Sequence, residues 1–231
     1  MKKHLLITGA SSGIGRALAI LAENHHCKLS LCGRNENKLT QTLKELKRSS
    51  NTVADSFCIT ENSSFKRFLS KANAKHGDVD VLVNCAGLNN IRKQAQDINT
   101  EELALIMDVN FYAPVQCINS VLPQMLSRER GTIVNVLSTV CLFSNPGIAA
   151  YTASKAALDS YTKVMRKEIK HQGVKMLSIY PGGVDTYFRD NSRPDYLSAE
   201  EVAKAIFQQI NTDNNTHIHE LVIRPHCEEN F

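Results

Sequence analysis

The glycine-rich segment Thr8-Gly9-Ala10-Ser11-Ser12-Gly13-Ile14-Gly15 directly follows an apolar run, residues 4–8, and precedes a helical pattern over residues 16–23. Glycine is required in such a turn because the backbone bends sharply and has to approach a pyrophosphate closely. The N-terminus of the following helix offers free N–H groups and the positive end of a dipole. The order of strand, glycine-rich turn and helix therefore predicts a dinucleotide-binding α/β fold.

Short apolar runs alternate with longer helical patterns along the rest of the chain. The runs lie at residues 4–8, 28–32, 52–57, 79–84, 132–137, 174–180 and 220–224. They are apolar throughout and do not alternate with polar residues, which is typical of parallel strands covered by helices on both faces. We therefore expect a doubly wound (Rossmann) parallel sheet of about seven strands flanked by helices, in a single domain over residues 1–231.

Two long helices are predicted in the second half of the chain. Apolar side chains recur at spacings of three and four over residues 100–125, and Asn99 or Thr100 can cap that helix. A second helix is predicted over residues 149–171, with Gly173 as its stop. The first helix carries more apolar residues than a single core face requires. These additional apolar residues include Val109, Phe111, Val115 and Val121.

The charge pattern and the cysteines limit the classes of function. The 27 basic and 23 acidic residues give a net charge of +4 that is spread along the chain, which argues against a nucleic-acid partner. No apolar stretch is long enough to span a membrane, and polar residues end the first apolar run too early for a signal peptide. The seven cysteines form no Cys-x-x-Cys pair, so we expect reduced thiols, no metal site and a cytoplasmic location.

The end of the second apolar run indicates which nicotinamide cofactor is bound. An acid at this place holds the 2′-hydroxyl of the adenosine ribose, whereas an arginine accommodates a 2′-phosphate. The sequence here is Cys32-Gly33-Arg34-Asn35, with no acid before the arginine. Arg34 therefore favours NADP(H), with a solvated surface arginine as the alternative interpretation.

Tyr151 and Lys155 are four residues apart at the start of the second long helix, so they share one helix face. Moving the pKa of a tyrosine from about 10 to near 7 requires about 4 kcal/mol. A cation at roughly 4 Å supplies about that much at an effective dielectric constant of about 20. Such a pair also occurs by chance on surface helices. Ser138, at the end of the fifth strand, favours the catalytic interpretation because its hydroxyl would hold a substrate oxygen beside the phenol.

These residues, taken in order, resemble the classical short-chain dehydrogenase/reductase family over nearly the whole chain. Residues 8–15 look like its cofactor loop, and Asn84-Cys85-Ala86-Gly87 looks like its Asn-Asn-Ala-Gly segment. Asn110 resembles the helix asparagine that holds a proton-relay water, and residues 181–186 resemble the segment that closes on the nicotinamide. Ser138, Tyr151 and Lys155 match the catalytic set of the family.

The resemblance implies a role for each of these residues. Tyr151 would protonate the carbonyl oxygen, Ser138 would stabilise and orient it, and Lys155 would lower the pKa of Tyr151 and bind the nicotinamide ribose. Asn110 would connect Lys155 to solvent through water; the alternative is a purely structural, kink-stabilising asparagine. The residues expected to contact the cofactor are Gly9, Ser11, Ser12, Gly13, Ile14, Gly15, Arg34, Asn84, Ala86, Gly87, Tyr151, Lys155, Pro181, Gly182, Val184 and Thr186.

The resemblance also implies an oligomeric assembly, and the sequence departs from the family pattern at two positions. Its long helices usually form a subunit interface, so we expect a homodimer or a homotetramer. Cys85 replaces the second asparagine of the Asn-Asn-Ala-Gly segment, and Cys58 stands where the family usually has an aspartate that contacts adenine. Both departures put the adenine-side contacts in doubt.

The substrate is expected to be a small carbonyl compound or alcohol. In this family the segments after the fourth, fifth and sixth strands hold the substrate, which here are residues 88–98, 139–150 and 187–197. The last of these is short and leaves little material for a large lid. Cationic residues on two of the segments would suit a carboxylate, as in a short hydroxy or keto acid, or are simply solvated. They are Arg92, Lys93, Arg189 and Arg193.

Two other functions remain open at this stage. The segment 9–13 also fits the Gly-x-Ser-x-Gly pattern of a serine hydrolase, with Ser11 as the nucleophile. Only about ten residues precede Ser11, however, and the oxyanion hole of such an enzyme needs a loop from an earlier strand. The other alternative is a catalytically silent protein of the same fold that senses a nucleotide.

Overall fold

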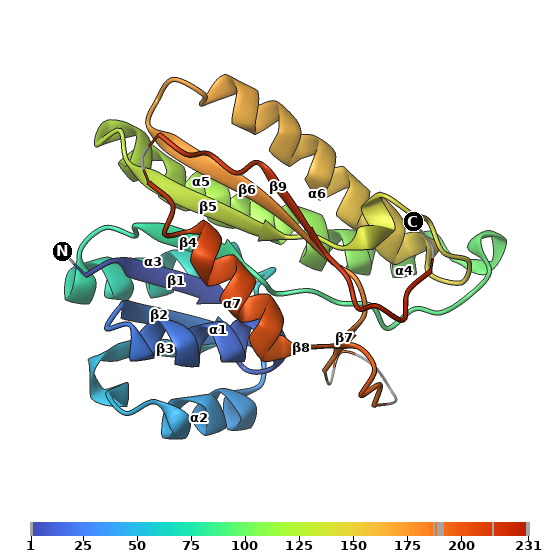
Figure 1. Ribbon diagram of the computed structural model, residues 1–231, viewed down its shortest axis with the longest axis horizontal. Coiled ribbons are helices and arrows are strands. Elements are labelled where there is room, and N and C mark those ends of the chain that lie inside the picture. The colour runs from blue at the N-terminus through green and yellow to red at the C-terminus, as the bar shows by residue number, and fades with distance from the viewer. Residues whose placement is uncertain (1, 187, 189–191, 214, 230–231) are drawn as a thin grey trace.

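The computed structural model describes residues 2–186, 188, 192–213 and 215–229. Its main sheet has seven strands in the order β3-β2-β1-β4-β5-β6-β9 (Figure 1), and every pairing is parallel. The strands are β1 (His4–Thr8), β2 (Lys28–Gly33), β3 (Thr52–Ser56), β4 (Val81–Asn84), β5 (Gly131–Val136), β6 (Val174–Pro181) and β9 (Glu220–Ile223). The predicted doubly wound parallel sheet is confirmed.

Helices connect the strands and cover both faces of the sheet. They are α1 (Gly13–Asn24), α2 (Glu36–Glu45), α3 (Asn62–His76), α4 (Thr100–Met107), α5 (Ala113–Ser127), α6 (Ala149–Glu168) and α7 (Ala199–Gln209). Short 3₁₀ turns lie at Ser49–Asn51, Ala95–Asp97 and Thr139–Cys141. The sequence analysis missed a small two-stranded sheet, which pairs β7 (Val184–Asp185) with β8 (Leu197–Ser198).

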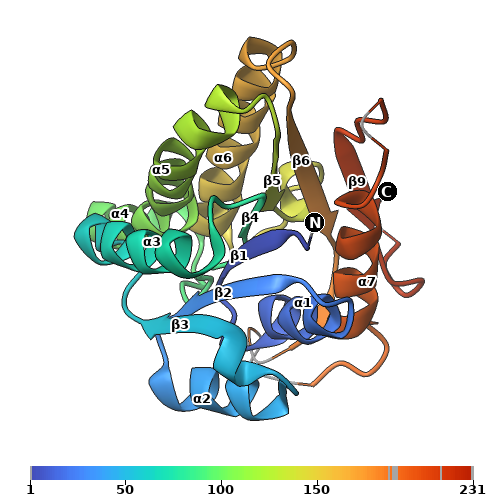
Figure 2. The same ribbon diagram turned by 90° about the vertical axis from the view of Figure 1, so that its left-hand side faces the viewer.

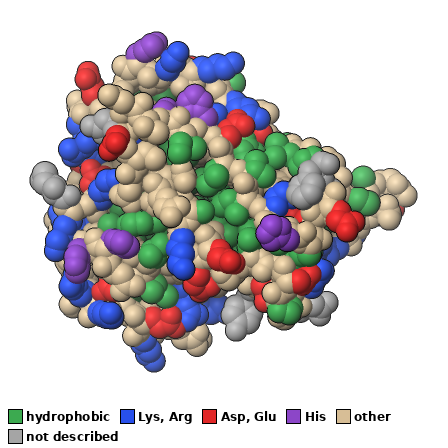
Figure 3. Space-filling view, in the orientation of Figure 1, with side chains coloured by type: hydrophobic (Ala, Val, Ile, Leu, Met, Phe, Trp, Pro, Cys, Tyr) green, Lys and Arg blue, Asp and Glu red, His purple; other side chains and the backbone are tan. Residues whose placement is uncertain are grey.

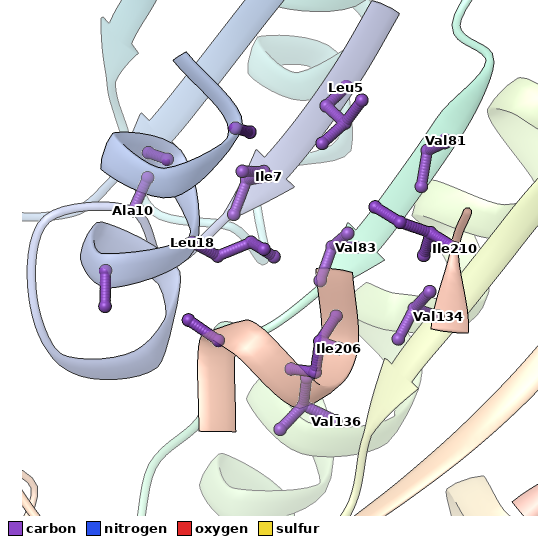
Figure 4. Packing of buried hydrophobic residues seen from close by; sticks show 14 of the residues in the cluster. Leu5, Ile7, Ala10, Leu18, Val81, Val83, Val134, Val136, Ile206 and Ile210 are labelled. Carbon is purple, nitrogen blue, oxygen red and sulfur yellow. The ribbon is translucent and has the colours of Figure 1, made fainter. Parts of the chain in front are cut away.

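The core consists of two apolar layers, one on each side of the sheet. Leu5 and Ile7 of β1 pack with Leu18 of α1 and Ile206 of α7 (Figure 4). Leu6, the residue between them, points to the other face and packs with residues of α3 and α5. Figure 2 shows these two pairs of helices on opposite sides of the strands. Each fully buried leucine or isoleucine stabilises the fold by about 1.5–3 kcal/mol. Because helices cover both faces of β1, consecutive apolar residues in this strand all contribute.

The strand order reverses at β1, which lies between β2 and β4. The segment after β1 leads to α1 on one face, whereas the segment after β4 leads to α4 and α5 towards the other. The two segments diverge and leave a crevice at the carboxyl ends of these strands, where ligands bind in open α/β sheets. The fold therefore positions a site between the glycine-rich turn and the end of β4.

The predicted helix over residues 100–125 is interrupted. Asn99 caps α4 in a capping box, as expected, but the turn over Asp108–Tyr112 is π-helical before α5 begins. The prediction that this helix carries four apolar residues beyond its core face is wrong for two of them. Val121 is fully buried and Val109 is only 9% exposed. Both side chains pack inside the molecule, so only the remaining apolar residues of the helix contribute to its outer surface.

The second long helix ends earlier than predicted. α6 stops at Glu168, and Gly173 belongs to the turn that leads into β6. Its φ of +70° and the carbonyl oxygen of Glu129, 1.9 Å from where a Cβ would lie, both require glycine. Gly173 therefore shapes the approach to β6 and does not end the helix.

The surface carries both signs of charge. On the face shown in Figure 3, basic and acidic side chains are interspersed with apolar ones. Within the described residues, no helix is long and apolar enough to cross a membrane. The same residues contain no cluster of three or more His, Cys, Asp or Glu side chains that would hold a metal ion.

Two buried histidines lie at the amino end of β1, away from the crevice. Nδ1 of His4 donates to the carbonyl oxygen of Gly77 at 2.8 Å, so its Nε2 accepts from the hydroxyl of Ser30, also at 2.8 Å. The ring of His76, at the end of α3, lies 5.1 Å from the His4 ring between centroids. Burial penalises the charged forms, so it lowers the pKa of His4 and lowers the pKa of His76 to about 4.

Acid should therefore destabilise the fold in a histidine-dependent way. Because burial holds the pKa of His76 in the folded state below the ordinary histidine value of 6.5, the unfolded chain binds more protons, and stability is lost as the pH falls from 6.5 towards 4. The variant His76→Gln should lose about 2–4 °C less in Tm than wild type between pH 7 and pH 5 in calorimetry. His171→Gln, at an exposed histidine, is the control, and equal losses in the two variants would contradict the expectation.

Candidate active site

The glycine-rich turn after β1 is shaped by two close backbone contacts. Gly9 has a φ of +68°, and a Cβ on it would lie 2.8 Å from the backbone of Ala86. A Cβ on Gly15 would lie 2.5 Å from the carbonyl oxygen of Gly9. Neither position accepts a side chain, so the turn packs directly on the segment after β4 and on the first turn of α1.

The side chain of Thr8 joins the ends of β1 and β4. Its Oγ1 accepts hydrogen bonds from the backbone N–H groups of Cys85 and Ala86, both at 3.1 Å. Thr8 is 1% exposed, so this hydroxyl satisfies two amides that water does not reach. The contact fixes the floor of the crevice.

A cavity of about 660 Å³ opens at the carboxyl ends of the strands, within the size range of cofactor sites. Most of the residues predicted for the site line it. These are Gly9, Ser11, Ser12, Gly13, Ile14, Arg34, Ala86, Gly87, Ser138, Tyr151, Lys155, Pro181, Gly182, Val184 and Thr186. Gly15, Asn84 and Asn110 are the predicted site residues that do not line it, and all three are buried.

Tyr151 and Lys155 enter the cavity from the first turns of α6. Their residues are 8% and 4% exposed, and the Nζ of Lys155 lies 5.9 Å from the centroid of the Tyr151 ring. Nζ also donates to the carbonyl oxygen of Val136 at 2.8 Å. Burial lowers the pKa of Lys155, an effect that the nearby thiols of Cys141 and Cys85 partly oppose. The four-residue spacing thus places the two side chains on one face of α6, while close approach of the ammonium group to the phenol oxygen stays a prediction.

Ser138 follows β5 and caps the short helix Thr139–Cys141. Its Oγ accepts from the backbone N–H of Val140 at 3.3 Å, so its own hydrogen is available to donate into the cavity. Leu137, the residue before it, is 3% exposed and packs with Leu158 of α6.

Asn110 lies in the π-helical turn and is fully buried. Its Oδ1 accepts from the N–H of Leu88, and its Nδ2 donates to the carbonyl oxygen of Leu88, both at 2.8 Å. Nδ2 also donates to the hydroxyl of Ser154 on α6 at 3.0 Å. A Cβ on Gly87 would lie 3.5 Å from Asn110 Oδ1 and 3.7 Å from Lys155 Nζ, so both side chains flank one backbone position.

Asn84 belongs to a buried chain of polar side chains behind the cavity. Its Nδ2 donates to Asn135 on β5 at 2.9 Å, and the amide of Asn135 donates to Thr162 on α6 at 2.8 Å. All three residues are at most 2% exposed. This chain ties β4, β5 and α6 together below the site, while contact of the Asn84 side chain with a cofactor stays a prediction.

One end of the cavity is cationic. Arg34 and Lys38 both line it, and Asn35 between them caps α2 by accepting from the N–H of Lys38 at 2.9 Å. Lys38 was missed in the sequence analysis, although it lies four residues after Arg34. Cys58 lines the cavity as well, with its Sγ 3.1 Å from Thr60 Oγ1.

The cationic residues of the segments that were expected to hold a substrate do not all line the cavity. Arg92 lines the cavity, but Lys93 pairs with Glu102 at 2.5 Å and is directed to a surface acid. Arg193 likewise pairs with Asp195 at 3.0 Å, and neither Lys93 nor Arg193 lines the cavity, so for these two the structure favours the alternative of solvated loop charges. The fourth, Arg189, lies outside the described residues.

Sequence reasoning also missed part of the cavity wall. Phe188 and Tyr196 come from the segment after β6, and the Phe188 ring lies 6.0 Å from the Tyr151 ring between centroids. Glu228 reaches the wall from beyond the last strand. Phe188 and Tyr196 belong to the segment 187–197 that was expected to hold the substrate, although neither was singled out, whereas Glu228 is far in sequence from every recognisable motif and only the fold reveals it.

The hydrolase alternative gains no support from the site. Ser11 lines the cavity, but among the described residues around it there is no histidine to act as a base. A Cβ on Gly33 would lie 2.9 Å from both Cβ and Oγ of Ser11, so the serine is packed closely against β2. Its surroundings match a cofactor loop and lack the partners of a nucleophile.

The residues present fit a dinucleotide. A glycine-rich turn whose close contacts exclude side chains lies at the N-terminus of α1, which suits a pyrophosphate. Arg34 and Lys38 suit a phosphate on the ribose, and the cavity extends from them to Tyr151.

Comparisons with known proteins agree with this geometry. The chain matches the model of the short chain dehydrogenase family over residues 3–197. An uncharacterized oxidoreductase of Staphylococcus saprophyticus is 31% identical over 228 residues, covering 96% of this chain and 97% of that protein.

Two solved structures have the same fold. An alcohol dehydrogenase from the archaeon Thermococcus sibiricus, complexed with 5-hydroxy-NADP, has a TM-score of 0.90 at 25% identity, covering 99% of this chain and 98% of the other. Serine dehydrogenase from Escherichia coli has a TM-score of 0.88 at 24% identity, covering 97% and 99%. The family match, the sheet and the cavity lead to one conclusion: this chain belongs to the short chain dehydrogenase family and is an oxidoreductase.

Proposed function

We propose that this oxidoreductase uses NADP(H) to interconvert a small carbonyl compound and its alcohol, with Tyr151 as general acid and base. One observation chiefly supports the proposal: Tyr151, Lys155 and Ser138 line the same cavity as the glycine-rich turn. The relative from Thermococcus sibiricus, an alcohol dehydrogenase that was solved with an NADP derivative, supports both the cofactor and the reaction class.

The cavity has two parts. The holding part would bind the phosphates of the cofactor, and the reacting part would contain the nicotinamide and the substrate. The N–H groups at the start of α1 would hold the pyrophosphate, and Arg34 and Lys38 would hold the 2′-phosphate. Pro181, Gly182, Val184 and Thr186 form the wall against which the nicotinamide would lie. Bound NADPH would supply the hydride for reduction.

The chain's own residues would handle the proton and the developing charge. Tyr151 would donate its hydroxyl proton to the carbonyl oxygen, while the Ser138 hydroxyl donates a hydrogen bond to the same oxygen. Lys155 would stabilise the phenolate that remains, and its bond to Val136 holds it in place. Asn110 would order a water beside Lys155 through which the proton is replaced.

The substrate class follows from the wall opposite the cationic end. Phe188 and Tyr196 give it an aromatic part, and Arg92 adds one cation that would suit a carboxylate. Short hydroxy or keto acids are therefore included among the small carbonyl compounds and alcohols that we propose.

Replacing Tyr151 with phenylalanine tests the mechanism. The ring is kept and only the proton carrier is lost, so turnover should fall at least about a hundredfold while NADPH affinity stays nearly unchanged. Lys155→Ala should lose both activity and NADPH affinity. The assay follows NADPH oxidation with a panel of aldehydes, ketones and keto acids.

The same assay separates the alternatives. A Tyr151→Phe enzyme within about threefold of wild type would rule out the mechanism. Ser11→Ala should keep its turnover, whereas its complete loss together with esterase activity in wild type would indicate a hydrolase. Tight NADPH binding without oxidation by any compound of the panel would indicate a nucleotide-sensing protein.

Cofactor choice is tested by titration. NADPH should bind more tightly than NADH, because Arg34 and Lys38 face the cavity and would pair with the 2′-phosphate. Arg34→Ala should weaken NADPH binding by about tenfold or more, as expected for a lost bond to a charged group, and leave NADH binding nearly unchanged. Lys44→Ala, at an exposed lysine of α2 outside the cavity lining, is the matched control. Equal wild-type affinities for the two nucleotides would contradict the proposal.

We also propose a homodimer or homotetramer formed through the long helices. Tyr112 and Val164 are 51% and 57% exposed, and Leu105 of α4 is 47% exposed. Such apolar side chains in an extended outer surface favour a partner. Light scattering at micromolar concentration should give a multiple of 25.7 kDa, and Tyr112→Asp with Val164→Asp should lower it. A wild-type mass of one chain would reject the assembly.

The cysteines support a reducing compartment, which we propose to be the cytosol. All seven are free thiols, and burial raises the pKa of Cys85 to about 11. A thiol with so high a pKa is protonated at neutral pH and reacts slowly. We further propose that residues 1–231 act as a single functional domain.

A further inference from the structure

The chain continues past β9 and returns to the cavity. The N–H of Gly182 donates to the carbonyl oxygen of Ile223 at 2.8 Å, which holds the end of β9 against the segment after β6. A turn closed by the N–H of Glu228 and the carbonyl oxygen of Pro225, at 3.2 Å, follows. This turn brings the Glu228 carboxylate to the wall that faces the proposed nicotinamide site.

Glu228 binds the backbone of that wall directly. Its Oε1 accepts from the N–H of Gly183 at 2.7 Å. A Cβ on Gly182 would lie 2.3 Å from Glu228 Oε2, and a Cβ on Gly183 would lie 2.4 Å from the Tyr196 ring. A side chain at either glycine would have to displace the Glu228 carboxylate or the Tyr196 ring, so both groups pack tightly against this part of the wall.

Arg224 completes the arrangement. Its Nη2 lies 3.2 Å from Glu228 Oε2, and the two side chains are only 8% and 18% exposed. Its guanidinium carbon lies 4.9 Å from the centroid of Phe143, in the segment that follows Ser138. A continuous series of contacts thus runs from Phe143 through Arg224 and Glu228 to Gly183.

This series joins the two segments that carry the reacting part of the site. One begins with Ser138, and the other contains the residues 181–186 on the cavity wall. The pairing of β9 with β6 extends only to Ile223, so the ion pair lies beyond the sheet. Because charges largely removed from water depend on each other, loss of one partner should release the other and loosen both segments.

We propose that Arg224 and Glu228 are positioning residues that hold the wall of the cavity in its binding geometry. They act through Gly183 and Phe143, and they set the affinity for NADPH and substrate more than the rate of the chemical step. This inference rests on the proposed function, because it assigns the pair to the same cavity.

Glu228→Ala is the main test, with Glu228→Gln as the conservative variant and Glu229→Ala as the matched control at an exposed neighbouring acid. Glu228→Ala removes the charged acceptor of the Gly183 N–H, so the Kd for NADPH and the KM for substrate should both rise roughly tenfold or more. The kcat should change less than about threefold. Glu228→Gln keeps an acceptor for Gly183 and should restore most of the affinity. Glu229→Ala should match wild type.

Hydrogen exchange gives a readout that is independent of activity. Amide exchange in the peptide 181–186, measured by mass spectrometry without cofactor, should accelerate in Glu228→Ala and stay unchanged in Glu229→Ala. If Glu228→Ala does not fold, Arg224→Lys carries the test, and it should raise the Kd for NADPH without unfolding the chain.

Two results would overturn the inference. One is a Glu228→Ala enzyme with wild-type Kd, KM and exchange; the other is a fall in Tm alone, which would make the pair merely structural. Failure of the proposed function looks different. Wild type would then bind no NADPH, while the exchange of peptide 181–186 would still report whether Glu228 holds the wall.

Discussion

The contact between the ends of β1 and β4 is the constraint on which the rest of the site depends. Reversal of the strand order at β1 opens a crevice, and its floor is set by the Thr8 hydroxyl, which binds two backbone amides after β4. Gly9 lies against Ala86 with no space for a side chain. A residue with a side chain at Gly9 would push the turn outward and separate the cofactor loop from the catalytic side of the cavity.

The side of the cavity that carries Tyr151 and Lys155 is also held in place by contacts with the backbone. Lys155 is buried, and its ammonium group is anchored to the carbonyl oxygen of Val136 at the end of β5. That bond orients the first turns of α6, so Tyr151 faces the cavity beside Ser138. Asn110 uses both N–H groups of its amide and one acceptor position of Oδ1 to bind Leu88 and α6, which explains why a polar residue is buried in a helix that bends through a π turn.

Most of the sheet and the motif residues could be predicted because each carries a local signal. Mostly apolar runs mark the parallel strands, and the four-residue spacing places Tyr151 and Lys155 on one face. Other features depend on tertiary contacts without such a signal. The π turn at Asn110 arises from bonds to a distant loop, and Glu228 resembles a solvated charge until the fold brings it to Gly183. For Arg193 the sequence left both interpretations open, and its ion pair with Asp195, two residues further on, favours a solvated charge.

The central claim is that this cavity directs a hydride from NADPH to a carbonyl carbon while Tyr151 supplies the proton. The most direct measurement is mass spectrometry of the alcohol formed from a mixed panel of carbonyl compounds, using NADPH that carries deuterium at the transferable position of the nicotinamide. The account expects one deuterium on the carbinol carbon with wild type and almost no labelled alcohol with Tyr151→Phe. Unlabelled alcohol from wild type, or equal labelling with both enzymes, would contradict it.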